Sequence, residues 1–179
     1  MKSHGKRFSP SKVAVIALVS ILCASACFVV AVQIISANVL SHSLDPQPAA
    51  QYAVGFHPDY VVLADFDGNG IADLAVANKD SSTVSILLGR GDGTFRSPLN
   101  IPVGPNPVSI AVGDFNADGK MDLVVALIGT NAVSVLLGNG DGTFQPAVTY
   151  GVQSIATSVA TADFNGDGKL DLAVANGTA

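Results

Sequence analysis

The stretch Asp163-Phe164-Asn165-Gly166-Asp167-Gly168-Lys169-Leu170-Asp171 decides the fold of this chain, because it is one of three copies. The others are Asp65-Phe66-Asp67-Gly68-Asn69-Gly70-Ile71-Ala72-Asp73 and Asp114-Phe115-Asn116-Ala117-Asp118-Gly119-Lys120-Met121-Asp122. The copies, at 65–73, 114–122 and 163–171, begin 49 residues apart both times. This fixed spacing indicates an internal repeat, which governs how the rest of the chain is interpreted.

Each copy places a side-chain oxygen at positions 1, 3, 5 and 9 and a Gly at position 6, where a sharp turn needs φ > 0. Hard cations such as Ca²⁺ take about 6–8 oxygen ligands. Asp-Gly and Asn-Gly are also good hairpin turns, but a bare turn does not explain Asp at positions 1 and 9 in every copy. We therefore predict Ca²⁺ rather than Mg²⁺, which demands tighter octahedral geometry. The predicted ligands are four side chains per loop and the carbonyl at position 7: Asp65, Asp67, Asn69, Ile71 and Asp73; Asp114, Asn116, Asp118, Lys120 and Asp122; Asp163, Asn165, Asp167, Lys169 and Asp171.

The loops are not EF-hands, which need a Glu at position 12 and flanking helices. Position 12 is Val76, Val125 or Val174, within apolar runs that indicate buried strands. In the middle copy we expect strands at 107–113, 123–127 and 132–137, a turn at 138–142 and a fourth strand from 143 to 150. Phe residues in the loops and after the turns should pack one unit on the next. Asp92 and Asp141 lie in the turns, where a hairpin role is favoured over a second cation site.

Four strands per repeat predict an all-β fold of propeller-type blades with four antiparallel strands each, an incomplete propeller of about 2.5 blades. A solenoid of stacked sheets is the alternative. The predicted organisation is a basic cytoplasmic N-terminus at 1–12, an apolar helix at 13–35, a linker at 36–52 and the repeats at 53–179.

The charge of the chain also restricts its function. All 14 acidic residues are Asp, against nine Lys and Arg, which gives a net charge of −5. Nucleic-acid binding requires a basic surface, whereas this chain is acidic, so we expect no nucleic-acid partner. Three scattered His residues, no nucleophile elbow and no zinc spacing favour a non-enzymatic protein.

The apolar run at 13–35 follows a basic cluster and is long enough to span a bilayer as a helix. It is either an uncleaved signal anchor, which would hold the chain in the membrane, or a signal peptide cut after Ala24-Ser25-Ala26 or near Ser36-Ala37. A lipoprotein Cys27 is disfavoured, because no Leu stands three residues before it. Either favoured alternative predicts a secreted or cell-surface protein.

The loops and the stretch Leu136-Leu137-Gly138-Asn139-Gly140-Asp141-Gly142-Thr143-Phe144 resemble the FG-GAP/VCBS repeat family, whose best-known members form the integrin α-chain β-propeller. The resemblance covers residues 53–179 and implies calcium at the ligands named above, in an exported adhesion or ligand-binding protein. A closed ring of about seven blades needs roughly 340 residues, so we expect a fragment of a longer protein rather than completion by association.

We accordingly predict an exported calcium-binding repeat protein that presents loops to an extracellular protein or glycan. The alternatives are a structural spacer on the cell surface and the repeat portion of a longer secreted enzyme. The sequence does not identify the ligand.

Overall fold

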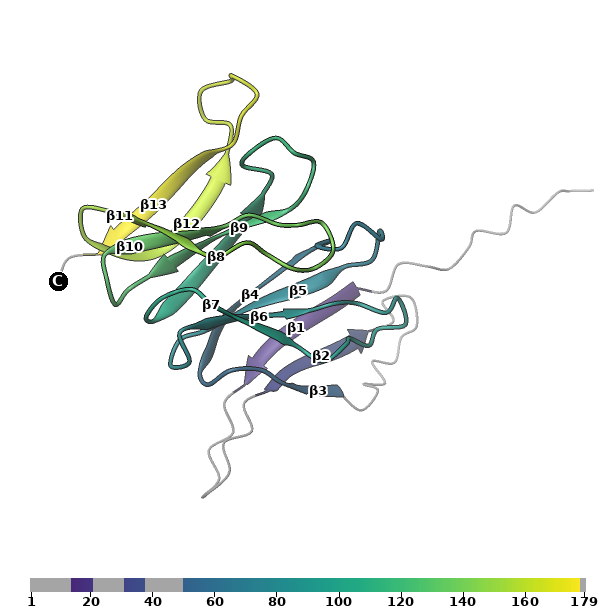
Figure 1. The fold of residues 1–179 in the computed structure, drawn as a ribbon. Coiled ribbons are helices and arrows are strands. Elements are labelled where there is room, and N and C mark those ends of the chain that lie inside the picture. The colour runs from purple at the N-terminus through teal and green to yellow at the C-terminus, as the bar shows by residue number, and fades with distance from the viewer. Residues whose placement is uncertain (1–13, 21–30, 38–49, 178–179) are drawn as a thin grey trace, which may run out of the picture.

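The computed structural model describes residues 14–20, 31–37 and 50–177, and this part of the chain is built from antiparallel β-sheets (Figure 1). The predicted all-β class is confirmed. The described residues form two four-stranded sheets, one three-stranded sheet and one two-stranded sheet, and none of these closes into a barrel. The predicted segment 1–12 lies outside the described residues.

The two four-stranded sheets are the predicted repeat units, and in each the strands follow chain order from one edge to the other. The fourth strand of the middle copy starts at Val148 rather than Thr143, since Phe144 makes only an isolated bridge to Gly138. The other predicted strands agree to within one or two residues. The sheets comprise β4 (Pro58–Ala64), β5 (Asp73–Asn78), β6 (Thr83–Leu87) and β7 (Leu99–Pro102), then β8 (Pro107–Gly113), β9 (Asp122–Leu127), β10 (Ala132–Leu136) and β11 (Val148–Gly151).

The last sheet has two described strands, β12 (Ile155–Ala162) and β13 (Asp171–Gly177). We expected 172–175 to be buried like its counterparts, and this expectation is wrong. Leu172 is 39% exposed, and Ala173 and Ala175 are also exposed. The physical reason is that β13 has a strand neighbour on one side only among the described residues.

The helix predicted at 13–35 stays a prediction, because only 14–20 and 31–37 of that stretch are described. β1 (Ala14–Ser20) and β2 (Ala31–Ala37) are antiparallel strands, and β2 also pairs with β3 (Ala50–Ala53). The stretch is rich in Val and Ile, which favour pleated strands. Residues 21–30 lie outside the description, as does most of the predicted linker. The described residues contain no helix long and apolar enough to cross a membrane.

The strand β3 belongs to the repeat, which the predicted boundary at 53 missed. It begins at Ala50, one full repeat period before β7 begins at Leu99, and β7 in turn begins one period before β11 at Val148. Each of these strands is the last of its sheet. The repeat pattern therefore begins inside the segment that we assigned to a linker.

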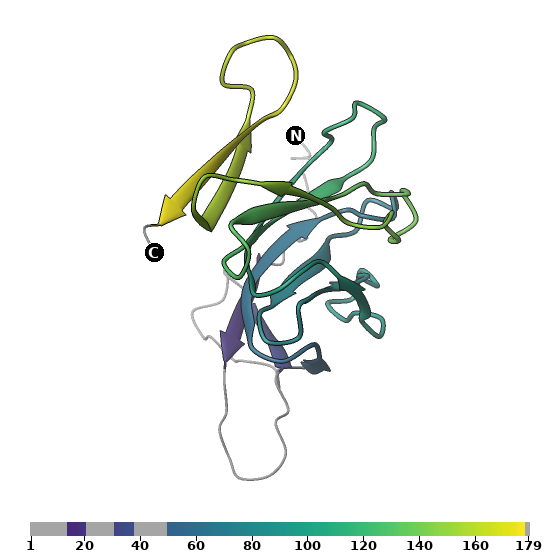
Figure 2. The same cartoon turned by 60° about the vertical axis from the view of Figure 1, so that its left-hand side comes forward.

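Successive sheets pack face to face, and their first strands lie side by side: β4 next to β8, and β8 next to β12 (Figure 2). Side chains of a strand alternate between its two faces. In β5, Leu74 and Val76 pack toward the preceding sheet, whereas Ala75 and Ala77 pack toward the following one. The same alternation in β9 joins it to both of its neighbours. Middle strands with both faces covered explain why 74–77 and 123–126 are apolar without interruption.

Aromatic rings connect one sheet with the next. Phe66 is 2% exposed, and its ring lies edge-on to that of Phe144, with 5.6 Å between centroids. The amide of Gly142 also donates to the Phe66 carbonyl oxygen at 3.0 Å. Phe95 packs in the same way on Tyr52 of β3, at 5.7 Å. The predicted packing role is confirmed for these residues and wrong for Phe164, which is 61% exposed.

Candidate metal centre

The three acidic loops join the first strand of a sheet to its second strand, at the same end of each sheet (Figure 1). The turns after β6 and β10 lie at this end as well, because those strands run antiparallel to β5 and β9. One end of the molecule thus carries all of the predicted ligand residues.

The Asp at position 1 holds the backbone of its own loop. Asp65 Oδ1 accepts a hydrogen bond from Asn69 N at 3.1 Å, and Asp65 Oδ2 accepts one from Gly70 N at 2.7 Å. Asp114 and Asp163 make the equivalent pairs of bonds. Donation by the Gly70 and Gly168 amides lowers the pKa of Asp65 and Asp163. Position 1 is therefore a fixed carboxylate that faces the loop.

The Asp at position 9 has a structural role that sequence reasoning missed. Asp73 is fully buried; its Oδ2 accepts from Phe66 N at 2.8 Å and its Oδ1 from Gly89 N at 2.7 Å. Asp122 makes the same two bonds with Phe115 N and Gly138 N. The bond to Gly89 or Gly138 fastens the loop to the turn of its own sheet. A sequence signal existed, since a Gly starts the turn at the same offset from each of these Asp residues.

Burial has an electrostatic consequence for Asp73. Desolvation raises its pKa, and the two backbone donors only partly oppose this effect, while nearby Asp67 and Asp65 add to it. A bound cation would favour the charged form of these carboxylates.

Three carboxylates of the first loop converge. One oxygen each from Asp65, Asp67 and Asp73 lies within 4.8 Å of the others. Two ligands of one Ca²⁺ ion, each at about 2.3–2.6 Å, are at most about 4.6–5.2 Å apart. The spread therefore fits a single shared cation. The Asn69 side chain turns its Oδ1 to the Ile71 amide at 2.7 Å, and Ile71 supplies the carbonyl at position 7.

The second and third loops share the backbone pattern but not this group of three, which among the described residues occurs only in the first loop. Position 3 is Asn116 or Asn165, whose amide nitrogen donates to Asp118 at 3.1 Å or to Asp167 at 3.3 Å. The Nζ of Lys120 also lies 3.6 Å from Asp118 Oδ2. Desolvation alone would raise the pKa of Asp118. The Lys120 amide, the Asn116 side chain and the Lys120 ammonium group outweigh it, so the pKa of Asp118 is lowered.

The turn residues Asp92 and Asp141 hold their own turns. Asp92 Oδ1 accepts from Thr94 N at 2.9 Å and from Thr94 Oγ1 at 2.6 Å, and Asp141 does the same with Thr143. The Thr hydroxyl groups lower the pKa of both carboxyls. These contacts agree with the predicted hairpin role.

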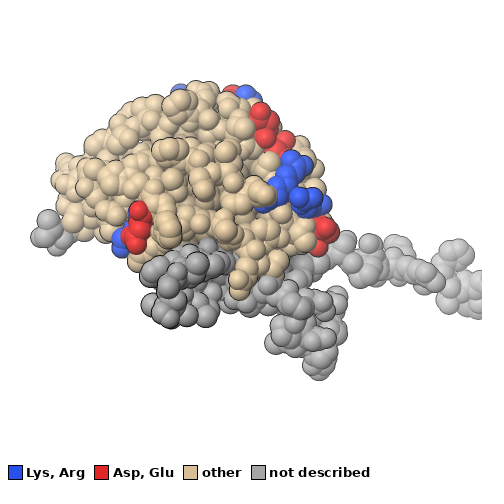
Figure 3. Space-filling model, turned by 60° about the horizontal axis from the view of Figure 1, so that its bottom comes forward, with Lys and Arg blue, Asp and Glu red and all other residues tan. Residues whose placement is uncertain are grey.

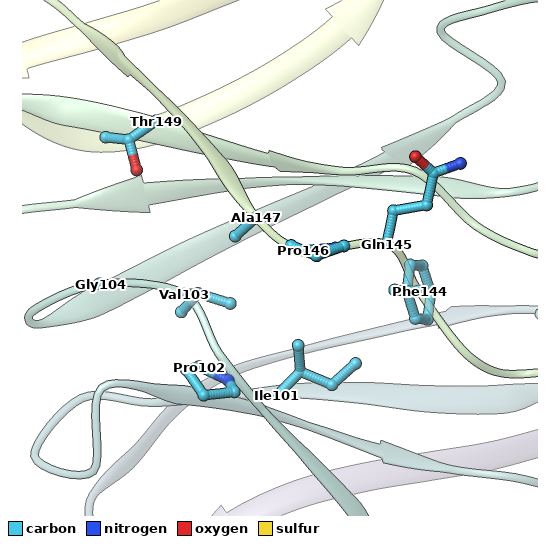
Figure 4. A pocket seen from close by; sticks show the side chains of 9 residues that line it. All are labelled: Ile101, Pro102, Val103, Gly104, Phe144, Gln145, Pro146, Ala147 and Thr149. Carbon is cyan, nitrogen blue, oxygen red and sulfur yellow. The ribbon is translucent and has the colours of Figure 1, made fainter.

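An open groove of about 490 Å³ lies between the end of β7 and the segment that leads into β11 (Figure 4). Its lining is largely apolar, and its polar side chains are those of Gln145 and Thr149. The face of the molecule in Figure 3 is mostly uncharged, with its Lys, Arg and Asp side chains near the margin. The acidic loops are thus the strongest candidate for a functional site.

Comparison with known proteins places these loops in a family. The model of the FG-GAP-like repeat matches twice, at 65–125 and 114–174. A search of curated proteins found no match. Among solved structures, a chain of the Tc holotoxin pore of Photorhabdus luminescens is similar, with 18% identity and a TM-score of 0.48. The match covers 88% of this chain but only 8% of that one.

Proposed function

Because the chain belongs to the FG-GAP-like repeat family, we propose that it is a calcium-binding protein whose sheets are propeller-type blades. The observation that carries the proposal is the convergence of Asp65, Asp67 and Asp73 to within 4.8 Å. Backbone amides already orient Asp65 and Asp73, so little reordering opposes binding. Successive sheets are stacked with their first strands next to one another, as in the blades of a propeller. This arrangement supports propeller-type blades over a solenoid of stacked sheets.

The three loops are proposed to differ in affinity. The first has three converging carboxylates, and no Lys of the described residues forms an ion pair with them. In the second loop, the Asn116 side-chain amide donates a hydrogen bond to the Asp118 carboxylate, and the Lys120 ammonium group forms an ion pair with it. A cation must displace these partners, which costs affinity. We therefore propose that the first loop is the strongest site and that the second and third are filled at higher Ca²⁺ concentration.

Calcium titration of the full chain tests this proposal. The expected result is saturable heat at up to three sites, with the tightest site at least tenfold weaker in Asp67→Asn. Asp80→Asn is the matched control, because Asp80 is an exposed Asp at the opposite end of the sheet. Absence of binding at millimolar Ca²⁺, or equal effects of the two substitutions, would refute the calcium assignment.

We further propose that the loop end of the sheets presents a non-enzymatic binding surface to an extracellular protein or glycan. The loops and turns at one end offer several adjacent exposed segments, and loops are where binding residues concentrate. A glycan and matrix-protein array provides the test. Binding that is lost on chelation supports ligand recognition, whereas no binding to any component favours a surface spacer.

Export is proposed to rest on the basic and apolar residues at the N-terminus. A signal is recognised as the chain emerges, before the sheet of β1, β2 and β3 can form. The N-terminal sequence of the protein recovered outside expressing cells would show whether cleavage occurs after Ala26 or near Ala37. Retention of the protein in the cytoplasm would contradict export.

A further inference from the structure

One position of the repeat holds tyrosine in two sheets and isoleucine in the sheet between them. Tyr52 of β3, Ile101 of β7 and Tyr150 of β11 follow one another at the repeat spacing of 49 residues. Each of the three strands is the last of its sheet. The three residues therefore have the same place in the repeat, but the one in β7 carries neither an aromatic ring nor a hydroxyl group.

Tyr52 shows what a tyrosine does at this position. Its ring lies edge-on to that of Phe95, and its hydroxyl oxygen accepts a hydrogen bond from Phe95 N at 3.0 Å. Phe95 forms an isolated bridge with Gly89, but the backbone hydrogen bonds of this bridge are made by the residues on either side. The Phe95 amide therefore points away from Gly89, and the Tyr52 hydroxyl group satisfies it.

The amide of Phe144, one repeat later, is left without this acceptor. Phe144 forms the same isolated bridge with Gly138, and the hydrogen bonds again run between the neighbouring residues. In the place of Tyr52 stands Ile101, which packs against the same cluster as Phe144 but has no oxygen to offer. Within the described residues the Phe144 amide thus has no acceptor. Phe144 is also only partly buried, whereas Phe95 is 9% exposed.

The space beside Ile101 is open. Ile101 and Phe144 line the groove of about 490 Å³ from its two sides, one from β7 and the other from the segment that leads into β11 (Figure 4). The described lining of this groove contains no charged side chain. Few polar groups on an apolar wall fix how a ligand lies. A neutral aromatic ring with one acceptor oxygen complements an uncharged groove with one free backbone donor.

We propose that this groove binds the phenol ring of a tyrosine side chain presented by a partner protein. The ring lies between Ile101 and Phe144, and its hydroxyl oxygen accepts from the Phe144 amide, as Tyr52 does from Phe95. Burial of the ring supplies the affinity, and the amide supplies the preference for tyrosine over phenylalanine. The two residues are not among the proposed calcium ligands, so binding is expected in EDTA.

The test follows the amide signals of the isotope-labelled full chain by NMR in EDTA, while N-acetyl-tyrosinamide or N-acetyl-phenylalaninamide is added. We expect a saturable shift of the Phe144 amide with the tyrosine derivative. The phenylalanine derivative lacks the hydroxyl group and should bind about two- to tenfold more weakly, which is what one neutral hydrogen bond contributes. It should also leave the Phe144 amide proton close to its position in the free protein.

The substitution Ile101→Tyr supplies the ring from within the chain. It should abolish binding of the tyrosine derivative and slow hydrogen exchange of the Phe144 amide. Ile101→Leu is the matched control, because it keeps an aliphatic side chain of the same size and should bind as the unchanged protein does. The comparison of the two derivatives on the unchanged protein needs no variant, so it remains a test if Ile101→Tyr does not fold.

Three results would overturn the proposal. They are no shift of the Phe144 amide up to the solubility limit of the tyrosine derivative, equal binding of the two derivatives, and undiminished binding by folded Ile101→Tyr. The calcium titration addresses other residues, so either proposal can fail while the other stands.

Discussion

Replacing the buried carboxylate of Asp122 by Asp122→Ala is expected to destabilise the fold even when no cation is present. Asp122 is fully buried and accepts from Phe115 N at 2.9 Å and from Gly138 N at 2.8 Å. Hydrogen bonds to charged groups contribute about 1.5–3 kcal/mol each, so losing both costs about 3–6 kcal/mol. Domains are stable by only about 5–15 kcal/mol. The substitution thus removes a large share of the stability.

Urea unfolding in EDTA, followed by circular dichroism, measures this effect. With an m value of about 2 kcal/mol/M, the midpoint should fall by about 1.5–3 M. Asp171→Ala is the control, because Asp171 is partly exposed and accepts one such bond in the described structure. Losing a single bond at a partly solvated site should cost about 1–2 kcal/mol. Equal losses for the two variants, or a loss that appears only when Ca²⁺ is present, would refute the structural role of position 9.

Three further outcomes are expected. Phe66→Ala should cost about 3–5 kcal/mol, and a double-mutant cycle with Phe144→Ala should give a coupling of about 0.5–1.5 kcal/mol; additive losses would contradict the ring contact. Gly138→Ala should lower the free energy of unfolding by about 1–3 kcal/mol, because its Cβ meets a main-chain oxygen, and a neutral result in urea would disprove that collision. Thr143→Val should lower the melting temperature at pH 7 but not at strongly acidic pH. The pKa of Asp141 is below its ordinary value of 3.8 because Thr143 donates to it, so its contribution is present above 3.8 and is lost as the pH falls through the lowered pKa; an equal loss at both pH values would contradict this linkage.

Most of the fold could be predicted from the sequence because it is built from a repeat. The constant spacing of the loops, the turn glycines and the apolar runs predict the four strands of each complete sheet and place the loops between first and second strands. The packing of Phe66 on the next sheet was also predictable, because an aromatic residue recurs at fixed positions in loop and turn. These features depend on local chemistry and on repetition.

Other features depend on neighbours that a residue pattern does not name. Residues 73–78 and 171–176 are both Asp-Leu-Ala-Val-Ala-Asn and have the same propensities, yet the first segment is buried and the second is not, since burial is decided by the adjoining strands. The apolar residues at 14–20 and 31–37 fit a membrane helix and a strand equally well by hydropathy, so the residue pattern alone does not separate the two. The sequence predicts the position-9 Asp as a ligand but not as a link to the turn, because its partner amide lies 16 residues later, after the next strand of the chain.

The contact between Phe66 and Phe144 has a consequence for biosynthesis, because its two halves are far apart in the chain. Ribosomes add about 5–20 residues per second, so the roughly 80 residues between the two rings take roughly 4–16 s to be made. Until Phe144 has been made, the Phe66 ring lacks the aromatic partner that packs on it in the folded chain.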